Sequence, residues 1–183
     1  WKNVLRVEGH GNHVSRTTGE AMAVDPNNSD IIYVGTQKDG LLVSKDGGKS
    51  WSKNEALEDG FNEHGINIVM FDERYKDIDG NTAKIYASVA GKGLYISENS
   101  GETFKLLEGS PNYPSRLKMV GNTLYVAANA RTSLGVPVER GGLWKYVSGK
   151  WIEITPPPNS KGDNQQGIGA FIVDYTNTDF IIA

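Results

Sequence analysis

The residues with the clearest chemical potential lie in the stretch SKDGGKSW, Ser44 to Trp51, where an aspartate adjoins two glycines. Glycine-rich loops cradle phosphate groups, and an aspartate in such a loop can ligate a metal ion. The chain repeats the phrase as SENSGETF, Ser97 to Phe104, with Asn99 in the place of Asp46. Asparagine can cap the same turn but carries no charge. We therefore expect a structural turn at both places.

A third copy, YVSGKW, keeps Gly149 and Trp151 but has lost the aspartate. In the first copy, Asp46 can accept backbone N–H bonds, the glycines permit positive φ, and the aromatic residue can anchor the next strand. The residues to which we assign this structural role are Ser44, Asp46, Gly48, Trp51, Ser97, Asn99, Gly101 and Phe104.

Histidines and acidic turns are the other candidates for metal chemistry. His10 and His13 form an H-x-x-H pair, and together with His64 they could hold zinc. No further ligand spacing supports such a site, and no helix would fix the pair. The phrases GDNQQG and DIDGN offer oxygen ligands for calcium, but neither follows the EF-hand pattern. We predict no metal site and no cofactor.

Composition limits the possible classes of protein. A length of 183 residues suits one domain or a piece of a larger one. The formal charge of -3 gives no electrostatic reason to expect nucleic acid or an anionic membrane as a partner. The longest apolar runs, such as INIVMF, are too short to span a bilayer. There is no cysteine, which excludes disulfides and thiolate metal sites. The start WKNVLRVEGH lacks an initiator methionine and a signal peptide, so we expect an excised segment.

An aromatic residue recurs at Trp1, Trp51, Phe104 and Trp151, at spacings of 50, 53 and 47 residues. The last three follow the glycine-led strands GLLVS, GLYIS and GLWKY. In each repeat, the glycine-led strand is preceded by a strand with a central tyrosine: IIYVGT, KIYASV and TLYVAA. That strand is in turn preceded by a first strand: AMAVD, INIVMFD and RLKMV. Four short strands per repeat of about fifty residues are typical of a β-propeller blade. A β-sandwich would also have short strands, but not the same four-part phrase three times.

We predict an all-β fold of four-stranded antiparallel propeller blades, about three of them complete, with partial blades at both ends. The whole of 1–183 is expected to form a single partial propeller. The predicted blades are 16–54, 62–107 and 115–155, with a partial blade at 168–183 and the last strand of a preceding blade at 1–7. A self-closed four-bladed ring is the alternative.

The form S-x-D-x-G-x-[ST]-[WF] resembles the Asp-box (BNR) repeat of sialidases, sortilin-type receptors and glycoside hydrolase family 74, the xyloglucanase-type endoglucanases. The run from Arg16 to Lys53 is similar to the G-E-R-L-A-V-D-P-N-N phrase of family 74 and the blade that follows it. The next two repeats resemble the next two blades of that family. The chain looks like an internal fragment of such an enzyme.

In a propeller, the loops that lead into the first strand of each blade share one face with the loops between the second and third strands. We call this the loop face; the Asp-box turns lie opposite. Its loops are rich in side chains that bond sugar hydroxyls or stack on sugar rings. Our candidates for substrate binding are His10, Asn12, His13, Arg16, Gln37, Asp39, Phe61, His64, Tyr113 and Arg131.

The resemblance implies a secreted or periplasmic glycoside hydrolase acting on a β-glucan such as xyloglucan. Glycoside hydrolysis needs two carboxyl groups facing each other across the bond. In family 74 one of the two aspartates follows a T-D-I-G-G phrase, which this sequence lacks, and the other lies on a second propeller. We therefore assign no catalytic residue. The expected partners are a polysaccharide and the remaining blades or a second propeller, and this segment would form one wall of the cleft.

The alternative is a non-enzymatic Asp-box propeller that binds a glycan or a protein, as sortilin-like receptors do. A sialidase is a more distant possibility, since its chemistry needs clustered arginines and Arg16, Arg131 and Arg140 are scattered along the chain.

Overall fold

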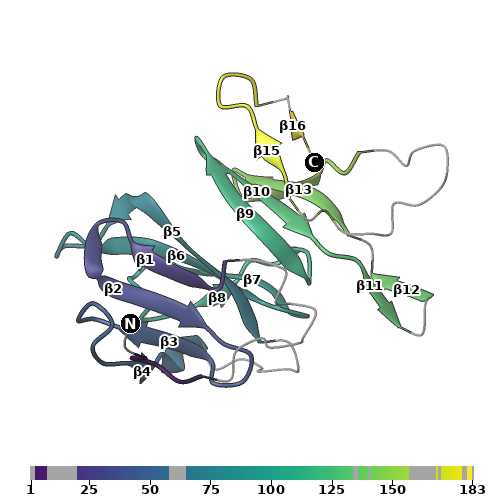
Figure 1. Cartoon of the computed structure of the whole chain (residues 1–183). Helices are drawn as coiled ribbons and strands as arrows, with labels where there is room; N and C mark the ends of the chain where they lie inside the picture. The colour runs from purple at the N-terminus through teal and green to yellow at the C-terminus, as the bar shows by residue number, and fades with distance from the viewer. Residues whose placement is uncertain are drawn as a thin grey trace.

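The structure is a computed structural model that describes residues 3–7, 20–57, 65–133, 136–139, 141–156, 168, 170–178 and 181–182, with the backbone alone at 131–133 and 136–139. Three four-stranded antiparallel sheets follow one another along the chain (Figure 1). The one helical element in the described ranges is the 3-10 turn η2 (Glu55–Leu57). Within these ranges no helix is long and apolar enough to cross a membrane. The prediction of an all-β fold built from four-stranded blades is confirmed.

The first sheet consists of β1 (Met22–Asp25), β2 (Asn28–Gly35), β3 (Leu41–Ser44) and β4 (Ser52–Lys53). The second consists of β5 (Ile66–Lys76), β6 (Thr82–Val89), β7 (Gly93–Ser97) and β8 (Lys105–Leu106). The third consists of β9 (Pro114–Val120), β10 (Thr123–Ala128), β13 (Gly142–Val147) and β14 (Lys150–Glu153). Each strand pairs with the strand before it in the same sheet.

Two smaller hairpins accompany these sheets. The strands β11 (Arg131–Ser133) and β12 (Val136–Glu139) form a hairpin inserted between the second and third strands of the third sheet, and it projects from the body in Figure 1. Beyond the third sheet, β15 (Ile172–Val173) pairs with β16 (Ile181–Ile182).

The inner strands of consecutive sheets lie next to one another, because β5 contacts both β1 and β9. The backbone N–H of Val69 on β5 donates 2.9 Å to the carbonyl oxygen of Glu20, just before β1. This is how blades meet around the axis of a propeller. The apolar sequence INIVMF of β5 follows from this position, since an inner strand has neighbouring blades on both sides.

The hydrophobic core is divided between the sheets. One cluster joins Tyr33 and Leu41 of the first sheet to Ile85 and Tyr95 of the second, and Phe104 packs against it. A second cluster joins the second sheet to the third and includes Tyr86, Leu124 and, at its margin, Trp151. Each fully buried side chain of this size contributes roughly 1.5–3 kcal/mol. Phe104 and Trp151, the aromatic residues that follow two of the turns, thus pack between neighbouring sheets. The sequence repeat by itself does not specify which sheets they join.

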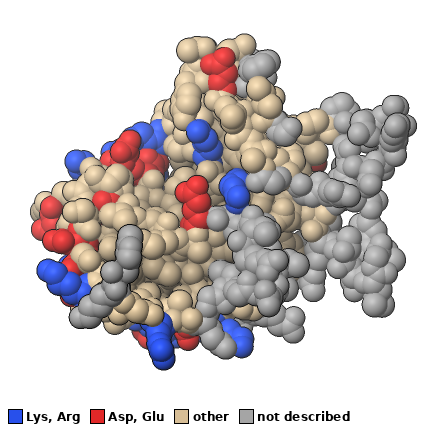
Figure 2. All heavy atoms as spheres, in the orientation of Figure 1, with Lys and Arg blue, Asp and Glu red and all other residues tan. Residues whose placement is uncertain are grey.

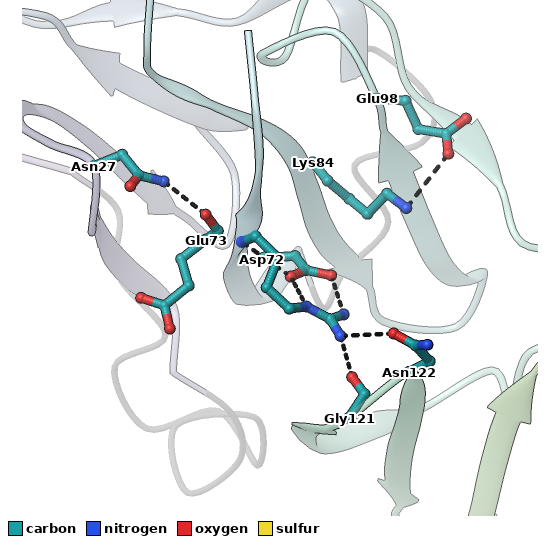
Figure 3. A network of polar contacts seen from close by, with 8 residues as sticks. Asn27, Asp72, Glu73, Lys84, Glu98, Gly121 and Asn122 are labelled. Carbon is teal, nitrogen blue, oxygen red and sulfur yellow. Dashed lines mark hydrogen bonds and ion pairs between the residues drawn. The ribbon is translucent and has the colours of Figure 1, made fainter.

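Buried aspartates of the inner strands reinforce these contacts. Asp25, which is 2% exposed, accepts hydrogen bonds from the Thr82 backbone N–H at 2.9 Å and from the Thr82 hydroxyl. At the corresponding place on β5, Asp72 forms an ion pair of 2.6 Å with Arg74. Figure 3 shows the Asp72 carboxylate bound to that guanidinium, which reaches Gly121 and Asn122 of the third sheet. The hydrogen bond to Asp72 raises the pKa of Arg74.

Candidate functional site

The turn between β3 and β4 is closed by Asp46. Its Oδ1 accepts hydrogen bonds from the backbone N–H groups of Lys49 and Ser50, both at 2.9 Å, and its Oδ2 accepts one from the Ser50 hydroxyl at 2.6 Å. The Ser44 hydroxyl donates to Asp46 Oδ1 at 2.8 Å and accepts from the Gly48 backbone N–H at 2.8 Å. These bonds, led by that from the Ser50 hydroxyl, lower the pKa of Asp46 to about 2. The carboxylate is fully engaged in the turn.

The turn between β7 and β8 repeats this geometry with an amide. Asn99 Oδ1 accepts a hydrogen bond from the Thr103 backbone N–H at 3.0 Å, and Asn99 Nδ2 donates to the Thr103 hydroxyl at 2.9 Å. Ser97 accepts from the Gly101 backbone N–H at 2.9 Å, as Ser44 does from Gly48. The negative charge is therefore not needed for the turn, because an amide makes equivalent bonds.

The third turn is shorter. Val147 pairs directly with Lys150, so only two residues connect β13 to β14. Both have positive φ, 51° at Ser148 and 77° at Gly149, as expected for a two-residue hairpin turn of type I′.

These turns lie at the end of the sheets where neighbouring sheets are joined. The Ser100 backbone N–H donates 2.9 Å to Ala83 O, and its hydroxyl donates 2.6 Å to Asp77. Its carbonyl oxygen accepts a bond of 3.1 Å from the Tyr33 hydroxyl of the first sheet. The backbone and hydroxyl groups of Ser100 are therefore used for packing within and between the sheets.

At the opposite end, the loops of one sheet contact the start of the next. The carbonyl oxygen of Thr36, in the β2–β3 loop, accepts a hydrogen bond of 2.9 Å from the Ile66 N–H at the start of β5. The Gly91 N–H, in the β6–β7 loop, donates 2.8 Å to Asn112 O ahead of β9. The two kinds of loop therefore meet on one face, the loop face.

The chain ahead of β9 is held at both ends. The Leu94 backbone N–H donates 2.9 Å to the Ser110 hydroxyl, and the Asn129 N–H donates 2.9 Å to Tyr113 O. The side-chain amide of Asn67, in the second sheet, donates a hydrogen bond of 2.9 Å to the carbonyl oxygen of Pro114 at the start of β9. This segment crosses from the second sheet to the third and is tied to both.

A hollow of about 250 Å³ opens beside this segment, lined by residues 110–113 together with Ala128, Asn129 and Trp144. None of the described residues that line it carries a charge. Two aromatic rings and two side-chain amides are suited to a neutral ligand with hydroxyl groups, because rings offer apolar contact and amides offer both donors and acceptors. We take this hollow as the candidate functional site.

The sequence-predicted binding residues are distributed unevenly relative to the hollow. Tyr113 lines it. Gln37 and Asp39 lie on the β2–β3 loop and are not among its lining residues. Arg131 lies on β11, where only the backbone is described. The other candidates lie outside the described residues: His10, Asn12, His13, Arg16, Phe61 and His64.

Sequence reasoning missed Trp144, and it did not select Asn129 from the polar loop that this residue begins. Trp144 belongs to the strand phrase GLWKY, which was interpreted only as a framework element, and Asn129 follows directly on β10. The available signal was the change from leucine and tyrosine to tryptophan at one position in the three copies, GLLVS, GLYIS and GLWKY.

A second hollow of about 250 Å³ lies between the sheets and is lined by Pro26, Asp72, Arg74 and Gly121 among others. Arg74 donates to Asp72, Gly121 and Asn122, so its polar groups are already engaged (Figure 3). Among the described residues no group of three or more His, Cys, Asp or Glu is arranged to hold a metal ion. On the face shown in Figure 2, acidic and basic side chains are interspersed, without a basic patch of the kind that nucleic acids require.

No protein-family model matches the chain. The xyloglucanase Xgh74A of Acetivibrio thermocellus is 32% identical over 201 aligned residues, which cover 99% of this chain and 24% of that protein. The glycoside hydrolase family 74 xyloglucanase of Xanthomonas campestris has a similar structure, with a TM-score of 0.77 at 26% identity, covering 93% of this chain and 27% of that one. For the family 74 enzyme of Niastella koreensis the TM-score is 0.75 at 33% identity, over 94% of this chain and 26% of that one.

The chain thus spans about a quarter of the length of the relatives it matches. It resembles a fragment of a glycoside hydrolase family 74 enzyme, and its sheets correspond to blades of the propellers in that family.

Proposed function

We propose that this chain is a portion of a secreted β-propeller glycoside hydrolase acting on xyloglucan, and that its loop face forms one wall of the polysaccharide-binding cleft. The observation that carries the proposal is the similarity to xyloglucanases along 99% of the chain. The neutral, aromatic hollow on the loop face supports it, because a polysaccharide without charges offers hydroxyl groups and apolar ring faces to such a surface.

In this proposal, residues 16–54, 62–107 and 115–155 are successive blades of a larger ring. Residues 168–183 begin a further blade, and residues 1–7 end a preceding one. The packing of each sheet against the next supports this division, since every described core cluster draws residues from two neighbouring segments of the chain.

The chemistry of glycosidic bonds suggests that this segment binds the polysaccharide and that other parts of the protein cleave it. Hydrolysis needs an acid and a second carboxyl group on opposite sides of the bond. None of the described residues that line the hollow is acidic, so this wall binds and orients the glucan while other parts of the longer protein supply the carboxyl groups. The partners of this segment are then the polysaccharide and the remaining blades or a second propeller.

Affinity electrophoresis of the 183-residue chain tests the binding role. Xyloglucan included in the gel should retard the chain, and mannan at the same concentration should leave its mobility unchanged. Equal mobility in the two gels and in a gel without polysaccharide would refute the proposal that this face binds xyloglucan.

A non-enzymatic binding module is the second candidate, and the lack of an acidic side chain among the described lining residues favours it. Both candidates predict binding without turnover by this chain. They differ for the longer protein with its flanking blades and second propeller, which releases oligosaccharides from xyloglucan only if it is a hydrolase.

A further inference from the structure

Trp144 occupies a strand position whose counterpart in the second sheet is buried. It pairs with Val126 across β13 and β10, as Tyr95 pairs with Ala87 across β7 and β6. Tyr95 is 7% exposed and belongs to the core between the first and second sheets. Trp144 is only half-buried and lines the hollow. At this position the third sheet presents an aromatic ring to the loop face instead of burying it.

The orientation of the Trp144 ring depends on Gly142. A Cβ atom at Gly142 would lie 2.9 Å from Trp144 Cη2 and 3.2 Å from Cζ3, so a side chain there would require the ring to shift. The ring therefore lies over the bare backbone of Gly142 and points along the strand toward the loop face. Gly142 also faces the Thr155 hydroxyl, 2.3 Å from the same Cβ position, so the strand end is closely packed.

The Trp144 indole and the Asn129 side-chain amide both line the hollow. Among the described residues, no hydrogen bond uses the Trp144 indole N–H or the Asn129 side-chain amide. The backbone of Asn129 is fixed through its bond to Tyr113 O. An anchored amide next to an aromatic plane can donate and accept hydrogen bonds without a large loss of side-chain freedom on binding.

We propose that Trp144 and Asn129 form a binding site for a single pyranose ring, with the sugar stacked on the indole and its hydroxyl groups bonded to the amide. A pyranose has one face of C–H groups for the aromatic plane and hydroxyl groups at its edge for the amide. The volume of about 250 Å³ lies below the roughly 300–1,000 Å³ of pockets that enclose larger ligands, so it suits one ring. The uncharged lining selects a neutral sugar. This inference rests on the proposed function and names the contacts that the wall would make.

Titration of the 183-residue chain with a xyloglucan oligosaccharide and with cellotetraose, followed by the indole N–H signals in NMR spectra, tests the site. The Trp144 signal should shift, and Trp144→Ala should weaken binding about tenfold, as removal of a central aromatic contact does. Trp144→Phe keeps a ring and should bind within about threefold of the unmodified chain. Trp51→Phe is the matched control, because Trp51 lies at the opposite end of the sheets and should not affect binding.

Asn129→Ala provides a second measurement should Trp144→Ala fail to fold, since the Asn129 side chain makes no bond within the described residues. Its affinity should fall about fivefold. Binding that is unchanged in Trp144→Phe, Trp144→Ala and Asn129→Ala would overturn the site while leaving the proposed function intact. Trp144-dependent binding of cellotetraose without binding of the xyloglucan oligosaccharide would support the site and contradict the proposed substrate. Failure of the unmodified chain to bind either sugar would overturn both.

Discussion

The Tyr33 hydroxyl of the first sheet donates a hydrogen bond of 3.1 Å to the carbonyl oxygen of Ser100, in the turn that closes the second sheet. This bond fixes the distance between two consecutive sheets at the end opposite the loop face. It also explains the glycine that follows Ser100, because a Cβ atom at Gly101 would lie 2.2 Å from the Tyr33 hydroxyl oxygen. The turn motif is therefore specified partly by its own conformation and partly by the neighbouring sheet.

Gly101→Ala should destabilise the chain more than Gly80→Ala. The two glycines have nearly the same φ, 85° and 86°, so the conformational cost of alanine is similar at both. Only at Gly101 would the new methyl group collide with Tyr33, since Gly80 has nothing within 4 Å of its Cβ position. We expect a difference of about 1–3 kcal/mol in the free energy of unfolding, measured by urea denaturation. Equal losses would show that the contact between the sheets is not a constraint on the turn.

Tyr33→Phe should lower the free energy of unfolding by about 0.5–1.5 kcal/mol, because it removes the bond to Ser100 O and keeps the ring. Burial raises the pKa of Tyr33 to about 12 from its ordinary value of 10.0. A raised pKa means that this contribution is complete below about pH 10 and is lost as the pH rises toward 12. The difference in stability between the unmodified chain and Tyr33→Phe should therefore shrink over that range. Tyr175→Phe, at an exposed position, is the control.

Aspartate and asparagine should be interchangeable in the two long turns. In Asp46→Asn the new amide can donate to Ser50 as Asn99 donates to Thr103, and Asn99→Asp reverses the exchange. Both variants should unfold thermally close to the unmodified chain at pH 7, whereas Asp46→Ala and Asn99→Ala should unfold at lower temperature. A large drop in the unfolding temperature of Asp46→Asn, together with an unchanged unfolding temperature of Asp46→Ala, would contradict a role of Asp46 in closing the turn.

The acid dependence of stability provides an independent check on Asp46. Its hydrogen bonds lower its pKa from 3.8 to about 2. A lowered pKa means that the charged form stabilises the fold above about pH 4, and that this contribution disappears as the pH falls toward 2. Urea midpoints of the unmodified chain and of Asp46→Ala, which should differ at pH 7, should accordingly converge as the pH falls through this range. A constant difference between the two midpoints would be inconsistent with the assigned bonds.

Asp25 and Thr82 should be energetically coupled although they belong to different sheets. Asp25→Ala leaves a buried N–H without a partner and should cost about 2–4 kcal/mol, and Thr82→Val should cost about 1–2 kcal/mol. Because the two side chains bond each other, the double variant should lose at least 0.5 kcal/mol less than the sum of the single losses. Additive losses, measured by urea denaturation, would argue against a shared contact.

The strands could be predicted from the sequence because each repeat carries its own signals. The glycine-led phrases, the central tyrosines and the turn residues are local features, and β3, β7 and β13 lie where these features place them. The similarity to family 74 was also recognisable from the ordered phrases. The prediction of an all-β blade fold is therefore confirmed.

The contacts between repeats could not be predicted in the same way. Leu42, Tyr95 and Trp144 share one position in the strand phrase, yet Tyr95 is in a core cluster and Trp144 lines the hollow. Their environment depends on the segment that crosses from the preceding sheet, which no single repeat encodes. For the same reason, Phe104 and Trp151 proved to pack between sheets. Most of the predicted binding residues lie outside the described residues, so those assignments remain predictions.

If the loop face binds the polysaccharide and the turns on the opposite face serve only packing, the polysaccharide should protect the loop face and leave the turns unaffected. Hydrogen exchange of the 183-residue chain, measured with and without a xyloglucan oligosaccharide, distinguishes the two faces. Exchange should slow on binding in residues 110–113 and 128–130 and around Trp144, and it should stay unchanged in the turns at 44–51 and 97–104. Protection confined to those turns, with none beside the hollow, would contradict binding of the polysaccharide at the loop face.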